Sequence, residues 1–391
     1  MGIKIRPYHR LILMLFCFFN IQHSFSQDDL DLAKRITTVD SSDLFLSDSY
    51  YIWGASVVKG DDGKFHMFYS RWPHADKPLD DDSLNYIFNG FSGWQKYSEI
   101  AHAVADNVMG PYKHVNVVLK GSGKDGDWKR FFMHNPMITT FNGKYYLYYI
   151  SNSFDSSYTF NNPPSPQNKR WMQYNCTQKI GVAIADKIED FSTGKFQLPE
   201  NWIMAPDGVN TLEIANNPTV AQGPDRKFYM MFKSRTAPRG HATMWMATAD
   251  KPDGPFTVTG NVFSTADFAA EDAFMWYDKK RRRFYAVLKN FSKSGKLNEQ
   301  FGSVALITSA DGLKWKPATH PMVTPRQITW KDGHVTELAH LERPFVYIND
   351  KGEPEALFAA FAKYPMGRSN YLIMGPGYNS GNVRIRLKPL K

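Results

Sequence analysis

The chain repeats one alternation of polar and apolar segments along most of its length. Each unit opens with a short polar signature, continues into an apolar run, turns at Gly, Asp or Asn, and returns through a run rich in aromatic residues. Short β-branched and aromatic runs bounded by turn residues are typical of strands in hairpins. The paired runs are 53–58 with 64–69, 134–138 with 144–149, 216–220 with 227–232, 271–276 with 283–288, and 342–346 with 355–358. The pattern therefore predicts five repeated hairpins.

A second signature marks the end of a later strand in each of four units. The dipeptide Ala-Asp recurs at residues 105, 185, 249 and 310, at intervals of 80, 64 and 61 residues. A repeat of this length with three or four strands is typical of a β-propeller blade and not of a helical solenoid. The sequence thus predicts an all-β, five-bladed β-propeller. We expect the C-terminal run 383–387 to close the ring by pairing with N-terminal strand material, because closure removes exposed sheet edges.

The N-terminal segment differs from the rest of the chain. Lys4, Arg6 and Arg10 precede an apolar run at 11–19 that is too short to span a bilayer, and small and polar residues follow. This pattern predicts a signal peptide at residues 1–26 and a single catalytic propeller domain at 27–391, exported to the periplasm or the extracellular space. A lipid anchor at Cys17 is the less favoured alternative. Cys176 is then the only mature cysteine, which excludes an intramolecular disulfide.

Charge adds little to this picture. The formal net charge of +9 falls to +6 when the signal peptide is removed, and the one dense basic run, residues 279–283, lies at an expected hairpin turn. A solvated turn explains this run better than a polyanion patch, and export argues against a nucleic-acid partner. Phosphate-binding loops, dinucleotide fingerprints, serine-nucleophile elbows and the paired-histidine zinc motif are all missing from the sequence.

Propeller geometry converts sequence position into location. The start of the first strand, the end of the second and the start of the third in each blade all meet one face of the ring. We predict that polar and aromatic residues at these positions converge on one pocket. The predicted catalytic residues are Glu271, Asp272, Glu342 and His134, and the predicted substrate-binding residues are Trp53, Arg71, Trp72, Glu99, Asn135, Asn217, Lys233, His241, Lys289 and Arg343.

This set of side chains suits glycosidic bond cleavage. The reaction needs one protonated carboxyl group for the leaving oxygen and one ionised carboxylate for water or the anomeric carbon. Structural roles remain open for several candidates: Glu342 could pair with Arg343, and Arg71 with Glu99, without contacting substrate. Four cationic side chains are expected to face the channel, which is more positive charge than a neutral sugar requires: Arg71, Lys233, Lys289 and Arg343. A guanidinium group suits a carboxylate or a sulfate, so we expect an anionic terminal sugar with Arg71 as its main contact.

The phrases at 68–73, 98–103, 134–136, 271–277 and 341–344 resemble a branch of bacterial five-bladed propellers related to glycoside hydrolase family 43. The resemblance covers roughly residues 50–391. It implies a carbohydrate-active enzyme with a carbohydrate substrate. Family 43 enzymes place an Asp base, an Asp modulator and a Glu acid at the heads of blades one, two and three. The corresponding pairs here are Trp53-Gly54, His134-Asn135 and Asn216-Asn217. The family's catalytic roles therefore do not transfer, and the acids stand on blades four and five.

These observations predict an exo-acting glycoside hydrolase that needs no cofactor and has no predicted metal ligand. A structural cation held in the channel by backbone, Asn or Asp oxygens is compatible with this fold. Two alternatives stay open. One is a polysaccharide lyase in which His134 removes a proton beside a uronate carboxyl group. The other is a glycan-binding propeller without activity that uses Trp53 and Trp72 as platforms.

Overall fold

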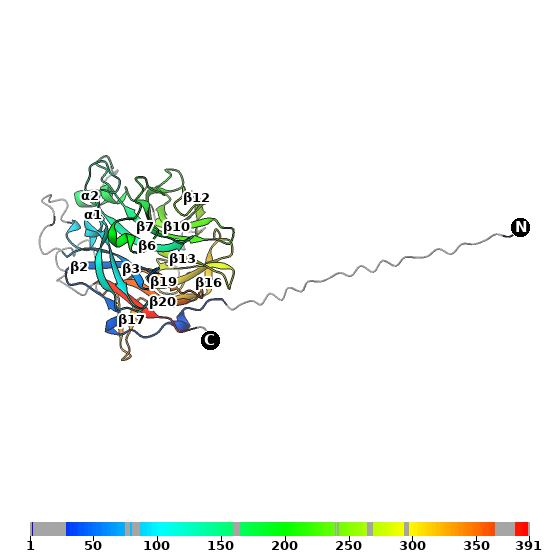
Figure 1. The fold of residues 1–391 in the computed structure, drawn as a ribbon. Helices are drawn as coiled ribbons and strands as arrows, with labels where there is room; N and C mark the ends of the chain where they lie inside the picture. The colour runs from blue at the N-terminus through cyan, green and yellow to red at the C-terminus, as the bar shows by residue number, and fades with distance from the viewer. Residues whose placement is uncertain are drawn as a thin grey trace.

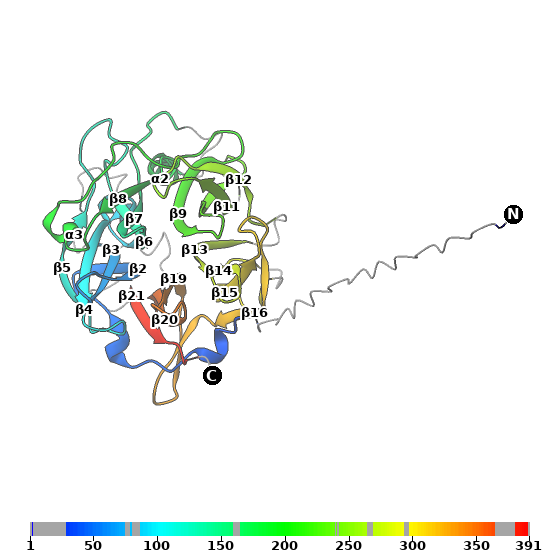
Figure 2. The same cartoon turned by 45° about the vertical axis from the view of Figure 1, so that its right-hand side comes forward.

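The computed structural model describes residues 2, 29–74, 79, 87–158, 165–238, 240, 242–263, 269–292, 297–363 and 380–389. Their strands form five antiparallel sheets around a central axis, together with one small two-stranded hairpin (Figures 1 and 2). The predicted all-β, five-bladed propeller is confirmed. The predicted signal peptide and His241 lie outside the described residues, apart from Gly2.

Each blade is a meander of strands ordered from the axis outward. Blade one contains β2 (Tyr50–Lys59), β3 (Phe65–Pro73), β4 (Glu99–Ala105) and β5 (Lys113–Leu119), and blade two contains β6 (Met133–Phe141), β7 (Lys144–Ser151) and β8 (Lys179–Ala185). Blade three contains β9 (Leu212–Gln222), β10 (Phe228–Arg235), β11 (Ala242–Ala249) and β12 (Thr257–Asn261). Blade four contains β13 (Ala270–Asp278), β14 (Arg283–Asn290), β15 (Val304–Ser309) and β16 (Lys316–Thr324).

Blade five draws its strands from both ends of the described chain. It contains β19 (His340–Ile348), β20 (Pro354–Ala362), β21 (Ser380–Arg386) and the short N-terminal β1 (Leu44–Phe45). The separate hairpin is β17 (Gln327–Thr329) with β18 (Val335–Glu337). The helices are short: η1 (Ala33–Arg35), η2 (Ser41–Asp43), η4 (Phe91–Gly93), α1 (Trp94–Tyr97), α2 (Pro166–Asn175) and α3 (Asp190–Thr193).

The predicted closure of the ring is confirmed. β1 pairs antiparallel with β21, with Leu44 opposite Val383, and Figure 2 shows the N-terminal segment beside the red β21. Arg384 of β21 is buried and donates from Nε to the carbonyl of Met109 in blade one at 2.8 Å. It also donates to the carbonyl of Ser42 in η2. The closing strand therefore holds together blade five, blade one and the N-terminal segment.

The inner strands β2, β6, β9, β13 and β19 are buried along most of their length, as expected for strands covered on both faces. The predicted hairpin turns are also present. Asn142 and Gly143 both adopt positive φ, 52° and 78°, as a two-residue turn between twisted strands requires. Among the described residues, no helix is long and apolar enough to cross a membrane.

Candidate active site

All five inner strands carry the same irregularity near their first residues. In each, one extra residue interrupts the pairing with the second strand, as between Glu271 and Phe274 in β13. In each, one residue of this β-bulge adopts a φ between 51° and 61°. We call these five residues the bulge ring: Gly54, Asn135, Asn217, Asp272 and Arg343.

The bulge explains why adjacent residues share one pocket. Successive side chains of a regular strand point to opposite faces, whereas a bulge with a left-handed residue breaks this alternation. Glu271 and Asp272 therefore both line the same cavity. A side chain at Gly54 would be crowded as well as strained, because a Cβ there would lie 3.3 Å from Oδ1 of Asn135 and 3.4 Å from Cγ of Arg343, at a φ of 58°.

The bulge ring lies between two cavities on the propeller axis. The cavity at the strand heads has a volume of about 170 Å³, and the one toward the other end has a volume of about 400 Å³. The larger cavity is lined mainly by apolar and aromatic side chains such as Met137, Phe274 and Trp276. The smaller cavity holds the three predicted catalytic carboxyl groups. Its lining residues are Trp53, Trp72, Phe91, Trp94, His134, Asn135, Asn216, Asn217, Lys233, Glu271, Asp272 and Glu342.

One wall of the smaller pocket is aromatic. Trp53 meets Phe91 edge to face, with ring centroids 5.0 Å apart. Trp94 stacks on His134 at 4.8 Å, and Nδ1 of His134 lies 2.8 Å from the hydroxyl of Ser98. Burial, followed by the nearby Arg343, lowers the pKa of His134 well below its ordinary value. His134 is therefore a neutral imidazole in this wall.

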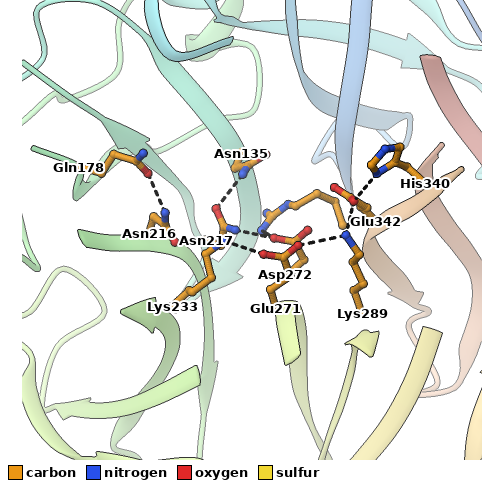
Figure 3. A network of polar contacts seen from close by, with 11 residues as sticks. Asn135, Gln178, Asn216, Asn217, Lys233, Glu271, Asp272, Lys289, His340 and Glu342 are labelled. Carbon is orange, nitrogen blue, oxygen red and sulfur yellow. Dashed lines mark hydrogen bonds and ion pairs between the residues drawn. The ribbon is translucent and has the colours of Figure 1, made fainter. Parts of the chain in front are cut away.

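The opposite wall is a chain of alternating charges from blades three, four and five (Figure 3). Nζ of Lys233 lies 2.7 Å from Oε2 of Glu271, and Nζ of Lys289 lies 3.2 Å from Oε1 of the same carboxylate. Lys289 also pairs with Glu342, which accepts a further contact from Nδ1 of His340 at 2.9 Å. Lys289 thus bridges two carboxylates from neighbouring blades.

The bulge ring forms a second set of polar contacts beside this chain of charges. Nδ2 of Asn135 donates to Oδ1 of Asn217 at 2.7 Å, and Nδ2 of Asn217 donates to Oδ1 of Asp272 at 2.5 Å (Figure 3). Nη1 of Arg343 lies 3.7 Å from the same Asp272 oxygen. Asp272 therefore faces both an amide donor and a guanidinium group.

These surroundings separate the three carboxyl groups by pKa. Burial opposes ionisation of Glu342, but Lys289 and His340 outweigh it and lower its pKa to about 2. Burial also opposes ionisation of Glu271, and Lys233 with Lys289 lowers its pKa. Burial and then the negative charge of Glu271 raise the pKa of Asp272 to about 6, against the opposing effect of Arg343. The pocket therefore combines two ionised carboxylates with one readily protonated carboxyl group.

A metal ion between these acids would have to share them with the cations already present. Oxygen atoms of Glu271, Asp272 and Glu342 lie within 4.8 Å of one another. Lys289 contacts two of these residues and Arg343 faces the third. The arrangement is that of a charge-balanced network, and these contacts do not favour a cation site here.

Most of the predicted site residues meet in or directly behind this pocket. Lys289 and Arg343 lie behind the lining and contact its acids. Arg71 and Glu99 are placed elsewhere: Nε of Arg71 lies 2.8 Å from Oε1 of Glu99, its guanidinium covers the ring of Tyr50, and neither residue lines the pocket. Arg71 and Glu99 thus form an ion pair with each other, which was the structural alternative to the predicted contact with substrate.

Besides Asn216, three contributors were not among the site residues predicted from the sequence. Phe91 and Trp94 come from η4 and α1, in the long connection between β3 and β4, and His340 precedes Glu342 by two residues in β19. Long connections inside compact domains are often functional, and residues two apart in a strand share a face. Both signals were present in the sequence.

No family model matches the chain. One curated relative, the extracellular endo-alpha-(1->5)-L-arabinanase 2 of Bacillus subtilis, is 26% identical over 250 residues. This match covers 60% of the present chain and 45% of the relative, so it spans less than half of the relative's length.

Solved structures agree over nearly the whole chain. A family 117 glycoside hydrolase from the marine bacterium Zobellia galactanivorans is 17% identical, with a TM-score of 0.56, over 90% of this chain and 89% of that one. An alpha-L-arabinofuranosidase from Lactobacillus brevis is 10% identical, with a TM-score of 0.52, over 91% and 94%. The resemblance predicted from the sequence is confirmed at the level of the fold. The chain has the five-bladed propeller fold of these glycoside hydrolases.

Proposed function

We propose that the protein is an exported, exo-acting glycoside hydrolase that releases a terminal sugar from a polysaccharide or oligosaccharide. The observation that carries this proposal is the unequal pairing of three carboxyl groups inside one pocket. Glu271 and Glu342 contact lysine side chains, which lower their pKa values, whereas Asp272 lies 3.7 Å from Arg343 and close to Glu271, and its pKa is raised to about 6. Glycosidic cleavage requires this combination of a protonated and an ionised carboxyl group.

The roles follow from the contacts of each acid. Asp272 delivers a proton to the leaving oxygen, since its surroundings favour the neutral form. Glu271, held ionised by two lysines, activates water or attacks the anomeric carbon. Glu342 keeps Lys289 in place and contributes negative charge near the developing oxocarbenium ion. The aromatic wall offers an apolar surface for the sugar ring.

The shape of the pocket supports action at a chain end. Its volume of about 170 Å³ is well below the roughly 300 Å³ at which drug-sized ligand sites begin, and the bulge ring lies at its inner end. Such a pocket suits one sugar unit. The curated relative, however, is named an endo-acting enzyme. Internal cleavage is therefore the second candidate.

The products distinguish these activities. We expect purified protein, incubated with a panel of plant and marine oligosaccharides, to release monosaccharide from the first minutes onward. A ladder of intermediate oligosaccharides would favour internal cleavage. An absorbance rise from a new unsaturated bond would favour the lyase, and tight binding without any product would favour a glycan-binding propeller. Either of the last two results would contradict the hydrolase proposal.

We further propose that the terminal sugar is anionic. Lys233, Lys289 and Arg343 face three carboxyl groups, and protonation of Asp272 for catalysis leaves three cations against two carboxylates. One carboxylate or sulfate on the sugar would restore the balance. Lys233 lines the pocket whereas Arg71 pairs with Glu99, so Lys233 replaces Arg71 as the proposed contact. We expect a lower kcat/KM for the carboxyl-reduced or desulfated oligosaccharide, and equal values would favour a neutral substrate.

Activity should decline with rising pH because the proposed acid must be protonated. Since the pKa of Asp272 lies at about 6, kcat/KM should fall as pH rises through about 6. A pH series of kcat/KM checks this. Asp272→Asn should remove the falling limb together with most of the activity. A plateau that continues to pH 8 in the unmodified protein would contradict the assignment of the acid.

Export remains a prediction from the N-terminal sequence. It fits a polysaccharide substrate, which the cell meets outside the cytoplasm, and the curated relative is named as extracellular. Mass spectrometry of the mature N-terminus would test it, with cleavage after residue 26 as the expected result.

A further inference from the structure

The bulge ring contains a directional chain of hydrogen bonds that ends on the proposed acid. Asn135 donates to Asn217, and Asn217 donates to Asp272. The three side chains come from the inner strands of blades two, three and four, and the three residues are 4% to 6% exposed. Asn135 is thus linked to Asp272 through one intervening amide.

The direction of this chain is fixed by the chemistry of the amide. A carboxamide presents an acceptor at its oxygen and donors at its nitrogen. Because Oδ1 of Asn217 accepts from Asn135, its nitrogen must face Asp272. The reversed amide would place nitrogen against nitrogen at one end and oxygen against the carboxylate at the other.

This orientation makes the two oxygens of Asp272 unequal. Oδ1 accepts the amide donor and faces the guanidinium of Arg343. Within the described part of the chain, Asp272 has no hydrogen bond to Oδ2. The proton of the neutral acid therefore belongs on Oδ2.

We propose that Asn135 is a positioning residue that acts through Asn217 to select the Asp272 oxygen that carries the catalytic proton. This inference rests on the proposed role of Asp272 as the acid. Asn135 itself lines the pocket, and its Oδ1 is buried without a hydrogen-bond partner among the described residues. A sugar hydroxyl that donates to this oxygen would extend the chain of hydrogen bonds to the substrate.

The test is the pH titration of the Asp272 carboxyl group. Carbon NMR of protein labelled at the Asp carboxyl carbons monitors the titration, and the Asp272→Asn variant identifies the Asp272 signal. Glycine accepts positive φ without strain, so Asn135→Gly and Asn217→Gly preserve the backbone. A donor to the ionised carboxylate lowers its pKa. We therefore expect Asn217→Gly to raise the Asp272 pKa by about one unit, and Asn135→Gly to raise it by roughly half as much although it makes no contact with Asp272.

Asn216→Ala is the matched control. Asn216 lines the same pocket, but its amide donates to Oε1 of Gln178 at 2.7 Å and lies outside this chain of hydrogen bonds. The Asn216→Ala change should leave the Asp272 titration unchanged, because it removes no hydrogen bond from the chain that ends on Asp272. The falling limb of kcat/KM should move with the NMR titration in each variant. An unchanged titration in Asn135→Gly, or an equal shift in Asn216→Ala, would overturn the proposal.

A second pair of variants keeps the test decisive if a glycine variant does not fold. Asn135→Asp preserves the shape but removes the donor, so the Asn217 amide should turn its nitrogen toward the introduced carboxylate and present its oxygen to Asp272. Asn216→Asp adds the same charge to the pocket without this effect. A larger rise in the Asp272 pKa for Asn135→Asp supports the inference, and equal rises refute it. Since NMR needs no substrate, a shift in a protein without hydrolase activity would refute the proposed function while supporting the hydrogen-bond chain.

Discussion

Replacement of Glu271 by Gln, Asp272 by Asn or Glu342 by Gln should each lower turnover by roughly two or more orders of magnitude. Losses of this size are expected when a proton donor, a base or a nucleophile is removed, as for Asp272 and Glu271. For Glu342 the loss follows from removing the carboxylate that holds Lys289 and faces the developing positive charge. Each change keeps the shape of the side chain and removes its charge, so folding should persist. Turnover of a verified oligosaccharide, with circular dichroism as the check on folding, measures the effect.

Glu337→Gln supplies the matched control, because Glu337 lies exposed on β18 in the small hairpin. It should retain the activity of the unmodified protein. Near-normal rates in all three pocket variants would mean that the acids of blades four and five are not the catalytic groups.

The second large effect is on stability. Lys289→Met should lower the free energy of unfolding at pH 7 by roughly 3–5 kcal/mol, as expected when one partner of a buried ion pair is removed. Lys289 is 6% exposed, and its loss leaves Glu271 and Glu342 facing each other with less positive charge. Urea unfolding monitored by tryptophan fluorescence measures the change.

The pH dependence of this deficit has a defined sign. Lys289 is a principal reason why the Glu342 pKa is lowered to about 2, so the pair stabilises the fold above the ordinary carboxyl pKa and loses this effect as pH falls toward 2. The deficit of Lys289→Met should therefore hold from pH 7 down to the ordinary carboxyl pKa of 4.5 and shrink as pH falls from there toward 2. Lys280→Met is the control, because Lys280 is exposed in its pair with Glu353 and such pairs contribute little. Equal deficits in both variants would contradict a special role for Lys289.

The fold was predictable because it repeats. Five similar hairpins, each with its turn residues, define the blades before any tertiary contact is known, and the meander within a blade places strand heads on one face. This reasoning correctly brings Glu271 of blade four and Glu342 of blade five together. They lie 71 positions apart, and Lys289 contacts both.

The finer geometry was not predictable in the same way. Arg71 and Glu99 occupy strand ends on the pocket side of the ring. However, they lie directly opposite each other on β3 and β4 and form an ion pair with each other, so neither side chain lines the pocket. Period-two alternation also predicts that Glu271 and Asp272 point apart. Only the bulge, which depends on pairing with β14, turns both toward the pocket.

The closing strand has a consequence for how the protein is made. β1 precedes the other described strands in the sequence, yet its partner β21 follows all of them. Blade five therefore cannot be completed until β21 has been synthesised, after the described strands of the other four blades. Because β21 lies between β20 and β1, a chain that stops shortly before residue 380 loses one strand and exposes the backbone of two others. Truncated chains should therefore aggregate through these open edges instead of folding as smaller propellers.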